Sequence, residues 1–131
     1  MTPGLILLAD DEPHITHVME RKLRSAGFEV ESAPDGEEAL ALAAEHRPDL
    51  IVTDLQMPYM SGIELAEALH ADARTAGIPV ILLTARGYFL SPDEIERTNI
   101  KRVVGKPFAA WALLETILEL LGTSGTSQEA A

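Results

Sequence analysis

With 131 residues, the chain has the length of a single domain that can bury a core, and its 47% hydrophobic content argues against a disordered polypeptide. The absence of cysteine excludes disulfide bonds, zinc–thiolate sites and thiol catalysis. The net charge of −11 would repel nucleic-acid phosphates, so we expect no direct binding to DNA or RNA. The N-terminal segment is neither a signal peptide nor a membrane span, and we expect a cytoplasmic protein without membrane contact.

Apolar runs typical of strands alternate with helical patterns along the chain. The runs cover 5–8, 28–31, 50–52, 80–83 and 103–104. Helical periodicity fills the intervals between them and continues from about 108 to 121. This alternation predicts βαβ units that form one parallel sheet, with an edge strand at 28–31. We assign 1–121 to one domain and 122–131 to a polar tail or linker remnant.

Three helix starts can be read from the sequence. Asp35 is expected to cap the second helix. The pairs Ser61 with Glu64 and Ser91 with Glu94 predict capping boxes at the third helix and at a short fourth helix. The last helix is expected to bury its apolar side chains, which are Trp111, Leu114, Leu118 and Leu121.

Polar residues follow four of the strand-like runs: Asp10 and Asp11, then Asp54, Thr84 and Lys106. Because parallel strands end at the same edge of a sheet, we expect these side chains to meet at one site. A charge at the end of an apolar central strand is costly unless it has partners, which singles out Asp54. Carboxylates, a hydroxyl and an ammonium in one place indicate a site for a metal and a phosphoryl group.

The first acidic stretch, Asp10-Asp11-Glu12, contains no glycine, which disfavours a dinucleotide-binding loop. Acidic side chains would repel a phosphate unless a cation lies between them, and carboxylate oxygens suit Mg²⁺. The sequence leaves an alternative open, in which Asp11 or Glu12 only caps the first helix, where a negative charge is favourable.

Together these residues resemble the receiver domain of two-component response regulators. The resemblance covers about 4–121 and rests on Asp10-Asp11, the segment 54–62 (DLQMPYMSG), Thr84 followed by Ala85, and 106–108 (KPF). It implies an α/β fold of the flavodoxin-like, doubly wound type, which is a five-stranded parallel sheet in the order 2-1-3-4-5 with helices on both faces.

The resemblance also implies which residues bind the phosphoryl group and the metal. Asp54 is expected to be the phosphoacceptor, which takes the group from a phosphohistidine of a sensor histidine kinase or phosphotransfer protein. Asp11 and Asp54 are expected to bind Mg²⁺ directly, together with the backbone carbonyl of Gln56, whereas Asp10 acts through water.

Two further residues are expected to contact the phosphoryl group. Lys106 would hold one phosphoryl oxygen, and Thr84 would move to bond another once the group is in place. The Lys106–Pro107 peptide bond is expected to be cis, a form that is accessible before proline. Such a domain acts by switching its interaction with a downstream protein, which the sequence does not identify.

One position departs from the pattern of receiver domains, and two positions are expected to affect the lifetime of the phosphoryl group. Receivers commonly carry Tyr or Phe three residues before the lysine, where this chain has Val103, so we expect an unusual relay from Thr84 to the fourth helix. Gln56 and Arg86 lie two residues after Asp54 and Thr84, at positions that in receivers flank the path of the hydrolytic water. We hypothesise that Arg86 screens the phosphoryl group and alters its rate of decay.

The leading interpretation is a phosphorylation-competent receiver, which is not an enzyme beyond accepting the group and losing it slowly. The main alternative is a pseudo-receiver that docks partners without using the site, and Val103 slightly favours it. An aspartyl phosphohydrolase would need an acid two residues after the nucleophile, where Gln56 stands. The sequence leaves open whether the protein is stand-alone or a fragment, and whether it is a monomer or a homodimer.

Overall fold

The computed structural model describes residues 4–85 and 88–122, over which five strands alternate with five helices as predicted. The strands are β1 (Leu5–Ala9), β2 (Glu29–Ala33), β3 (Leu50–Asp54), β4 (Val80–Ala85) and β5 (Ile100–Lys106). The helices are α1 (Pro13–Ser25), α2 (Gly36–His46), α3 (Gly62–Ala71), α4 (Pro92–Arg97) and α5 (Ala110–Leu121). None of these helices has the length and hydropathy that crossing a membrane would require.

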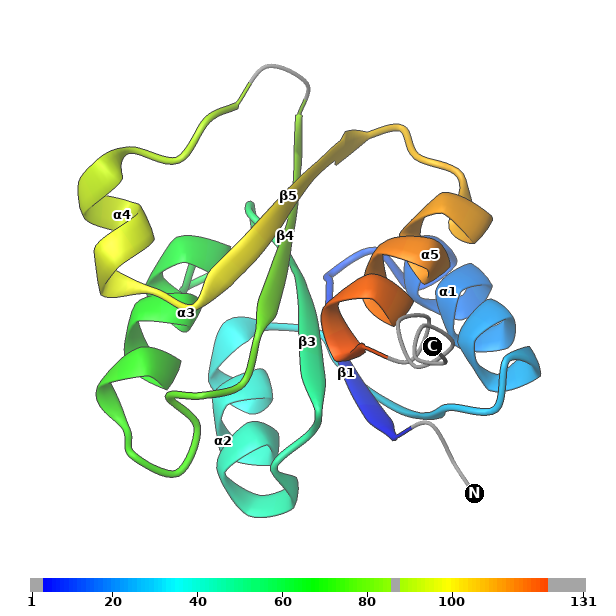
Figure 1. The fold of residues 1–131 in the computed structure, drawn as a ribbon, viewed down its shortest axis with the longest axis horizontal. Helices are drawn as coiled ribbons and strands as arrows, with labels where there is room; N and C mark the ends of the chain where they lie inside the picture. Colours follow the sequence, from blue (N-terminus) through cyan, green and yellow to red (C-terminus); the bar gives the residue numbers. More distant parts are fainter. Residues whose placement is uncertain (1–3, 86–87, 123–131) are drawn as a thin grey trace.

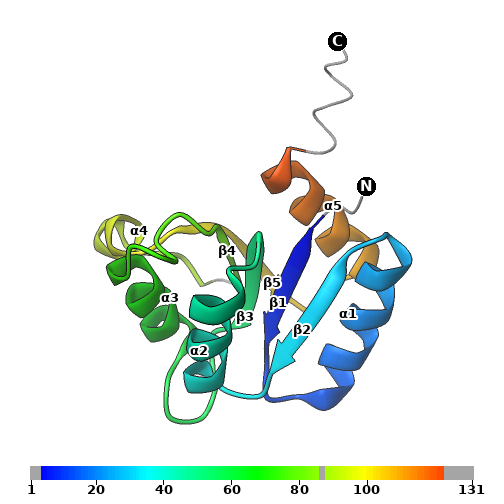
Figure 2. The same cartoon turned by 90° about the horizontal axis from the view of Figure 1, so that it is seen from below.

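All five strands are parallel and form one sheet in the predicted order β2-β1-β3-β4-β5. Figure 1 shows β1, β3, β4 and β5, and Figure 2 shows β2 beside β1. The chain runs outward from β1 to the edge strand β2 and then returns to β3 on the other side of β1. The connections that leave β1 and β3 therefore diverge. Open α/β sheets place their ligands in the crevice that such a divergence creates at the carboxyl ends of the strands.

Alternating side chains of the strands build a separate core on each face of the sheet. On one face the buried strand residues pack with α1 and α5, and on the other face with α2 and α3 (Figure 2). In β1, Ile6 and Leu8 belong to the first core, whereas Leu7 and Ala9 belong to the second. Because both faces are covered, the central strands are apolar without interruption, as their sequence runs indicated.

The predicted helix starts are confirmed. The Asp35 side chain accepts a hydrogen bond from the Glu38 backbone amide at 2.8 Å. Helices α3 and α4 each begin with a complete capping box, formed by the predicted serine and glutamate pairs. These side chains satisfy backbone amides that no helical carbonyl can reach. They therefore fix where α3 begins after the loop that follows Asp54.

One prediction for α5 is wrong, because Trp111 is 59% exposed rather than buried. Leu113 and Ile117 are the buried residues of this helix, and a side chain two positions before Leu113 is rotated about 200° away from it. The three leucines predicted together with Trp111 pack against the core and are partly buried. Of the tail predicted for 122–131, only Gly122 is described, and it ends α5 in the left-handed conformation with φ of 75°.

Candidate functional site

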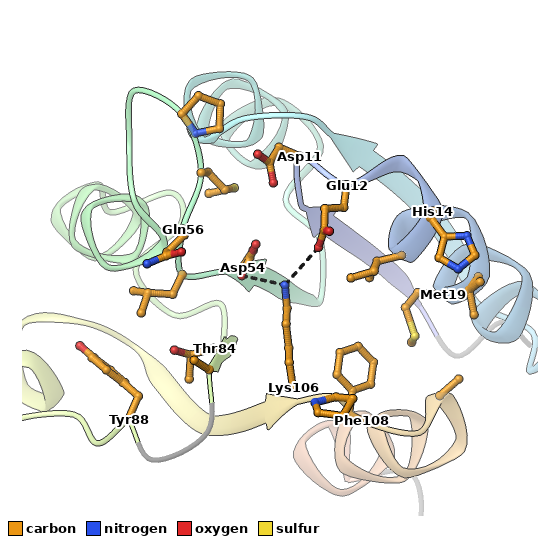
Figure 3. A pocket seen from close by; sticks show the side chains of 18 residues that line it. Asp11, Glu12, His14, Met19, Asp54, Gln56, Thr84, Tyr88, Lys106 and Phe108 are labelled. Carbon is orange, nitrogen blue, oxygen red and sulfur yellow. Dashed lines mark ion pairs between the residues drawn. The ribbon is translucent and has the colours of Figure 1, made fainter.

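A cleft opens at the carboxyl ends of β3, β4 and β5, and most of the predicted site residues line it (Figure 3). Its polar part carries Asp54, Thr84 and Lys106. The cleft extends between α1 and the segment that precedes α5, where Ile15 and Phe108 contribute apolar side chains. A charged end and an apolar extension therefore belong to the same cleft.

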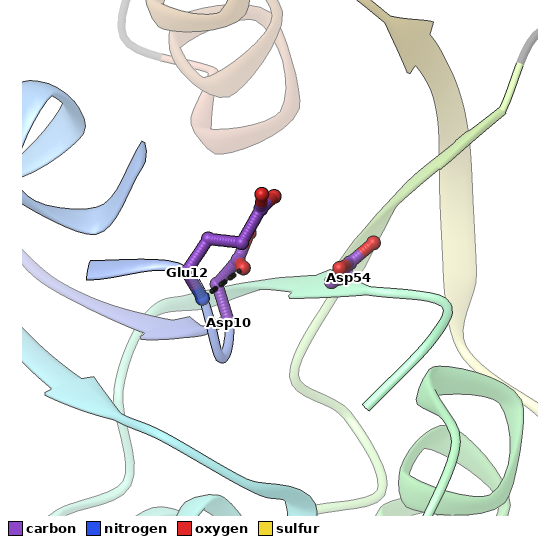
Figure 4. Close-up of side chains that lie close together, drawn as sticks. All are labelled: Asp10, Glu12 and Asp54. Carbon is purple, nitrogen blue, oxygen red and sulfur yellow. Dashed lines mark hydrogen bonds between the residues drawn. The ribbon is translucent and has the colours of Figure 1, made fainter. Parts of the chain in front are cut away.

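The register of the sheet brings Asp10 and Asp54 together. Ala9 of β1 lies opposite Thr53 of β3, so the next residue of each strand reaches the same edge. Asp10 is 6% exposed and Asp54 is 7% exposed. Glu12 joins them from the start of α1, and one carboxylate oxygen of each residue lies within 4.8 Å of the others (Figure 4).

Asp10 has one satisfied and one unsatisfied carboxylate oxygen. Its Oδ1 accepts a hydrogen bond from the Glu12 backbone amide at 2.9 Å. Its Oδ2 is buried without a hydrogen-bond partner among the described residues. Burial raises the pKa of Asp10, the hydrogen bond from the Glu12 amide acts against this, and the negative charge of Asp54 raises the pKa further. A buried oxygen with unused lone pairs is a place where a water or a cation is expected.

Lys106, at the end of β5, supplies the positive charge of the site. Its Nζ lies 3.1 Å from Oδ1 of Asp54 and 3.5 Å from Oε1 of Glu12 (Figure 3). Burial alone would lower the pKa of Lys106, but the hydrogen bond and charge of Asp54, with the charges of Asp10 and Glu12, raise it. Lys106 is therefore an ammonium that offsets part of the acidic cluster. The peptide bond between Lys106 and Pro107 is cis.

Other predicted site residues lie at the walls of the cleft. Asp11 and Gln56 line it but are exposed, and Asp11 is not among the three clustered carboxylates. Thr84 is buried, and its side chain lies on the side of Tyr88, away from the Lys106 ammonium (Figure 3). The structure thus brings together the lysine and two of the three predicted aspartates.

Two predicted modulating residues fall outside this arrangement. Val103 is partly buried and packs against the core that α2 and α3 share with the sheet. Its side chain therefore belongs to the packing of β5 rather than to the cleft. Arg86 lies outside the described residues.

Glu12 is a site residue that the sequence analysis did not assign. It stands at the N-cap position of α1, but its side chain makes no capping hydrogen bond, and its carboxylate contacts Lys106 instead. The capping alternative therefore does not describe this side chain. The sequence signal for Glu12 was its place after Asp10 and Asp11 in a run of three acidic residues. Which of these side chains contacts Lys106 depends on the tertiary structure.

The loop after β3 is held tightly against the strand that carries Asp54. The Gly62 amide donates a hydrogen bond to the Leu55 carbonyl at 2.8 Å. A Cβ at Gly62 would lie 2.3 Å from the Asp54 carbonyl oxygen and 2.9 Å from Cδ1 of Leu82. Glycine, which has no Cβ, allows α3 to begin this close to β3. This contact fixes the backbone of the buried aspartate.

The donor set of the site fits a hard divalent cation. Three carboxylates lie together, one of them with a buried oxygen that has no partner among the described residues. Their negative charge exceeds what Lys106 offsets. Mg²⁺ is typically bound through one or two carboxylates and keeps several waters. The acidic cluster is therefore chemically suited to Mg²⁺.

Comparisons with known proteins extend these observations. The family model of the response regulator receiver domain matches residues 6–118. The chain is 35% identical over 126 residues to the DNA-binding dual master transcriptional regulator RpaA of Synechocystis sp., covering 96% of this chain and 52% of RpaA. It is 32% identical over 120 residues to the polar-differentiation response regulator DivK of Brucella anthropi, covering 92% of this chain and 98% of DivK. The chain thus spans about half the length of RpaA and nearly all of DivK.

Solved structures agree with the fold. The chemotaxis response regulator CheY4 of Vibrio cholerae has a TM-score of 0.81 at 33% identity, with 88% of this chain and 97% of that chain covered. The receiver domain of the sensor histidine kinase PA1611 of Pseudomonas aeruginosa has a TM-score of 0.80 at 28% identity, with 91% and 98% covered. A magnesium ion is coordinated in the active-site cleft of that receiver domain. With the family model matched over most of its length, the chain belongs to the response regulator receiver domains of two-component systems.

Proposed function

We propose that the chain is a phosphoacceptor whose Asp54 takes a phosphoryl group from a phosphohistidine of a sensor histidine kinase or phosphotransfer protein. A carboxylate oxygen of Asp54 attacks phosphorus, the P–O bond forms, the P–N bond breaks and the imidazole leaves with the electron pair. One observation carries the proposal: Asp54 is buried at the end of β3 and contacts the Lys106 ammonium at 3.1 Å.

The proposal includes Mg²⁺. Asp11 and Asp54 would bind the ion directly with the backbone carbonyl of Gln56, and Asp10 would bind it through water. When bound, Mg²⁺ offsets the negative charge of the carboxylates and of the phosphoryl oxygens. The unpartnered oxygen of Asp10 and the clustered carboxylates of Asp10, Glu12 and Asp54 support a cation at this site. The assignments of Asp11 and Gln56 rest on the resemblance to receiver domains.

Phosphorylation would act as a switch because it changes the charge at the end of the sheet. The phosphoryl group adds a charge of about −1.5 to −2. Lys106 would hold one of its oxygens, and Thr84, which is buried at the end of β4, would move to bond another. A charge change of this size can bias a bistable loop and so alter the binding of a downstream protein. We place this switch in the cytoplasm.

The experiment is to incubate the protein with Mg²⁺ and acetyl phosphate and to measure its intact mass. One phosphoryl adduct is expected, and it should be absent in Asp54→Asn and after Mg²⁺ is removed with EDTA. Asp49→Asn is a matched control, because Asp49 immediately precedes β3 at the opposite end of the strand and is exposed. A folded wild type that takes no adduct would support the pseudo-receiver alternative, and an adduct that persists in Asp54→Asn would also contradict the proposal.

The lifetime of the adduct tests the proposed role of Arg86. We propose no enzymatic turnover beyond slow autodephosphorylation, with Arg86 and Gln56 next to the path of the attacking water. The half-life of the adduct, followed by mass after the donor is removed, should therefore change in Arg86→Ala. An unchanged half-life would contradict this role of Arg86 and leave the role of Asp54 intact.

A further inference from the structure

Glu12 has no role in the proposed function, although its carboxylate lies at the site. Lys106 Nζ is 3.1 Å from Asp54, whose side chain is 9% exposed, and 3.5 Å from Glu12, whose side chain is 58% exposed. The ammonium therefore lies between a buried and an exposed carboxylate, as the two dashed lines in Figure 3 show. The carboxylates of Asp54 and Glu12 thus contact the same ammonium group.

This shared contact matters because the proposed function requires Asp54 for something else. The carboxylate that Lys106 contacts must also bind the metal and attack phosphorus. Lys106 has to give up part of this contact, and an ammonium in a partly buried place needs another partner when it does. The Glu12 carboxylate is close enough to Lys106 to be this second partner.

The backbone of Glu12 is held in place for this contact. Its amide donates to Oδ1 of Asp10 at 2.9 Å (Figure 4). Its side chain makes no capping hydrogen bond to α1, so its carboxylate is available to Lys106. An oxygen of the same carboxylate lies within 4.8 Å of carboxylate oxygens of Asp10 and Asp54. A direct attraction of Mg²⁺ by Glu12 is therefore the alternative, and the test must distinguish it from an effect of Glu12 through Lys106.

We propose that Glu12 is a positioning residue, which holds the Lys106 ammonium at the mouth of the cleft and thereby frees Asp54 for Mg²⁺. The inference rests on the proposed function and adds a residue to it. Without Glu12, Lys106 would stay with Asp54 and compete with the metal. The expected consequence is weaker Mg²⁺ binding that depends on the presence of Lys106.

A double-mutant cycle tests this dependence. The dissociation constant for Mg²⁺ is measured by isothermal titration calorimetry in the wild type, Glu12→Gln, Lys106→Met and the double variant. Glu12→Gln should raise the constant about threefold to fivefold in the wild-type background, which is the effect of an exposed ion pair. In the Lys106→Met background it should change the constant by less than about twofold. Equal increases in both backgrounds, or no increase in either, would overturn the inference.

Two further variants keep the test sharp if Lys106→Met folds poorly. Glu12→Asp retains the charge but is one methylene shorter, so it should raise the Mg²⁺ dissociation constant almost as much as Glu12→Gln. A wild-type constant in Glu12→Asp would mean that charge alone acts. Glu29→Gln, at the amino end of β2 and exposed, is the control for net charge and should bind Mg²⁺ as the wild type does.

The outcomes also separate this inference from the proposed function. A wild type that takes a phosphoryl group on Asp54, but whose Mg²⁺ affinity is unaffected by Glu12→Gln, would contradict only the role of Glu12. A folded wild type that takes no phosphoryl group, but whose Mg²⁺ affinity depends on Glu12 only when Lys106 is present, would contradict the phosphoacceptor role and leave the role of Glu12 intact.

Discussion

Among single residues, Asp10 combines burial with an oxygen that has no hydrogen-bond partner among the described residues. Its pKa is raised above the ordinary value of 3.8, chiefly by burial, so the folded protein holds the Asp10 proton more tightly than the unfolded chain. The stability that this proton contributes is complete below pH 3.8 and is lost as the pH rises through the raised pKa. At neutral pH the charged carboxylate therefore lowers stability unless a cation is bound.

Asp10→Asn should raise the free energy of unfolding at pH 7, without Mg²⁺, by about 1 kcal/mol. Asparagine keeps the oxygen that accepts from the Glu12 amide and removes the buried charge. Urea unfolding measures the gain, which should shrink as the pH falls toward 3.8. Asp35→Asn is the control, because asparagine caps a helix as well as aspartate does. A loss of stability in Asp10→Asn at pH 7 would contradict the argument.

Gly62→Ala should destabilise the fold by about 2 kcal/mol, because the added Cβ would overlap the Asp54 carbonyl oxygen. The required shift of backbone should also slow the phosphorylation of Asp54. Thermal unfolding and the acetyl phosphate reaction measure the two effects. Gly77→Ala is a matched control, since a Cβ there meets nothing within 4 Å. Equal stabilities of the two alanine variants would show that the contact at Gly62 relaxes without cost.

Among the helices, α4 is held mainly by polar contacts. None of its residues is buried. The Tyr88 hydroxyl donates to the Glu94 carboxylate at 3.2 Å, and Arg97 forms an ion pair with Glu67 of α3 at 2.9 Å. Tyr88 also lines the cleft, so one side chain connects the proposed phosphorylation site with this helix. Local opening is expected where buried apolar contacts are few.

Tyr88→Phe should loosen α4 and leave the sheet unchanged, because it removes a hydrogen bond and keeps the ring. Backbone amides of α4 should exchange with deuterium about threefold to tenfold faster, which is the net effect of one hydrogen bond. Tyr59→Phe is the control, since Tyr59 is 91% exposed. If exchange in α4 is unchanged, Tyr88 does not hold the helix, and if it rises equally throughout the sheet, the effect is global.

Local sequence motifs were enough to predict where α2, α3 and α4 begin. The capping residues act on amides two or three positions away, so the starts of α2, α3 and α4 follow from short motifs. The face of α5 was harder to predict, because this helix is apolar on more than one side. Trp111 is expected in the core together with three leucines of this helix, but Leu113 and Ile117 occupy the face toward the sheet.

Over the chain as a whole, the order of the strands was predictable from the resemblance to receiver domains. The meeting of Asp10, Asp54 and Lys106 was predictable because parallel strands end at the same edge of a sheet. The contact between Glu12 and Lys106 could not be predicted. It joins residues far apart in the sequence and depends on how far each side chain reaches. The Thr84 side chain points away from the ammonium (Figure 3), and strand order does not specify such a side-chain direction.

The position of Lys106 on the last strand has a consequence for synthesis. A ribosome makes Asp10 and Asp54 well before it makes β5. Until β5 has joined the sheet, the two aspartates meet without their ammonium, and the proposed acceptor is chemically incomplete. We therefore expect a nascent chain without β5 to accept a phosphoryl group poorly. The order of the strands along the chain would delay the proposed phosphorylation until the crossover from β4 to β5 has folded.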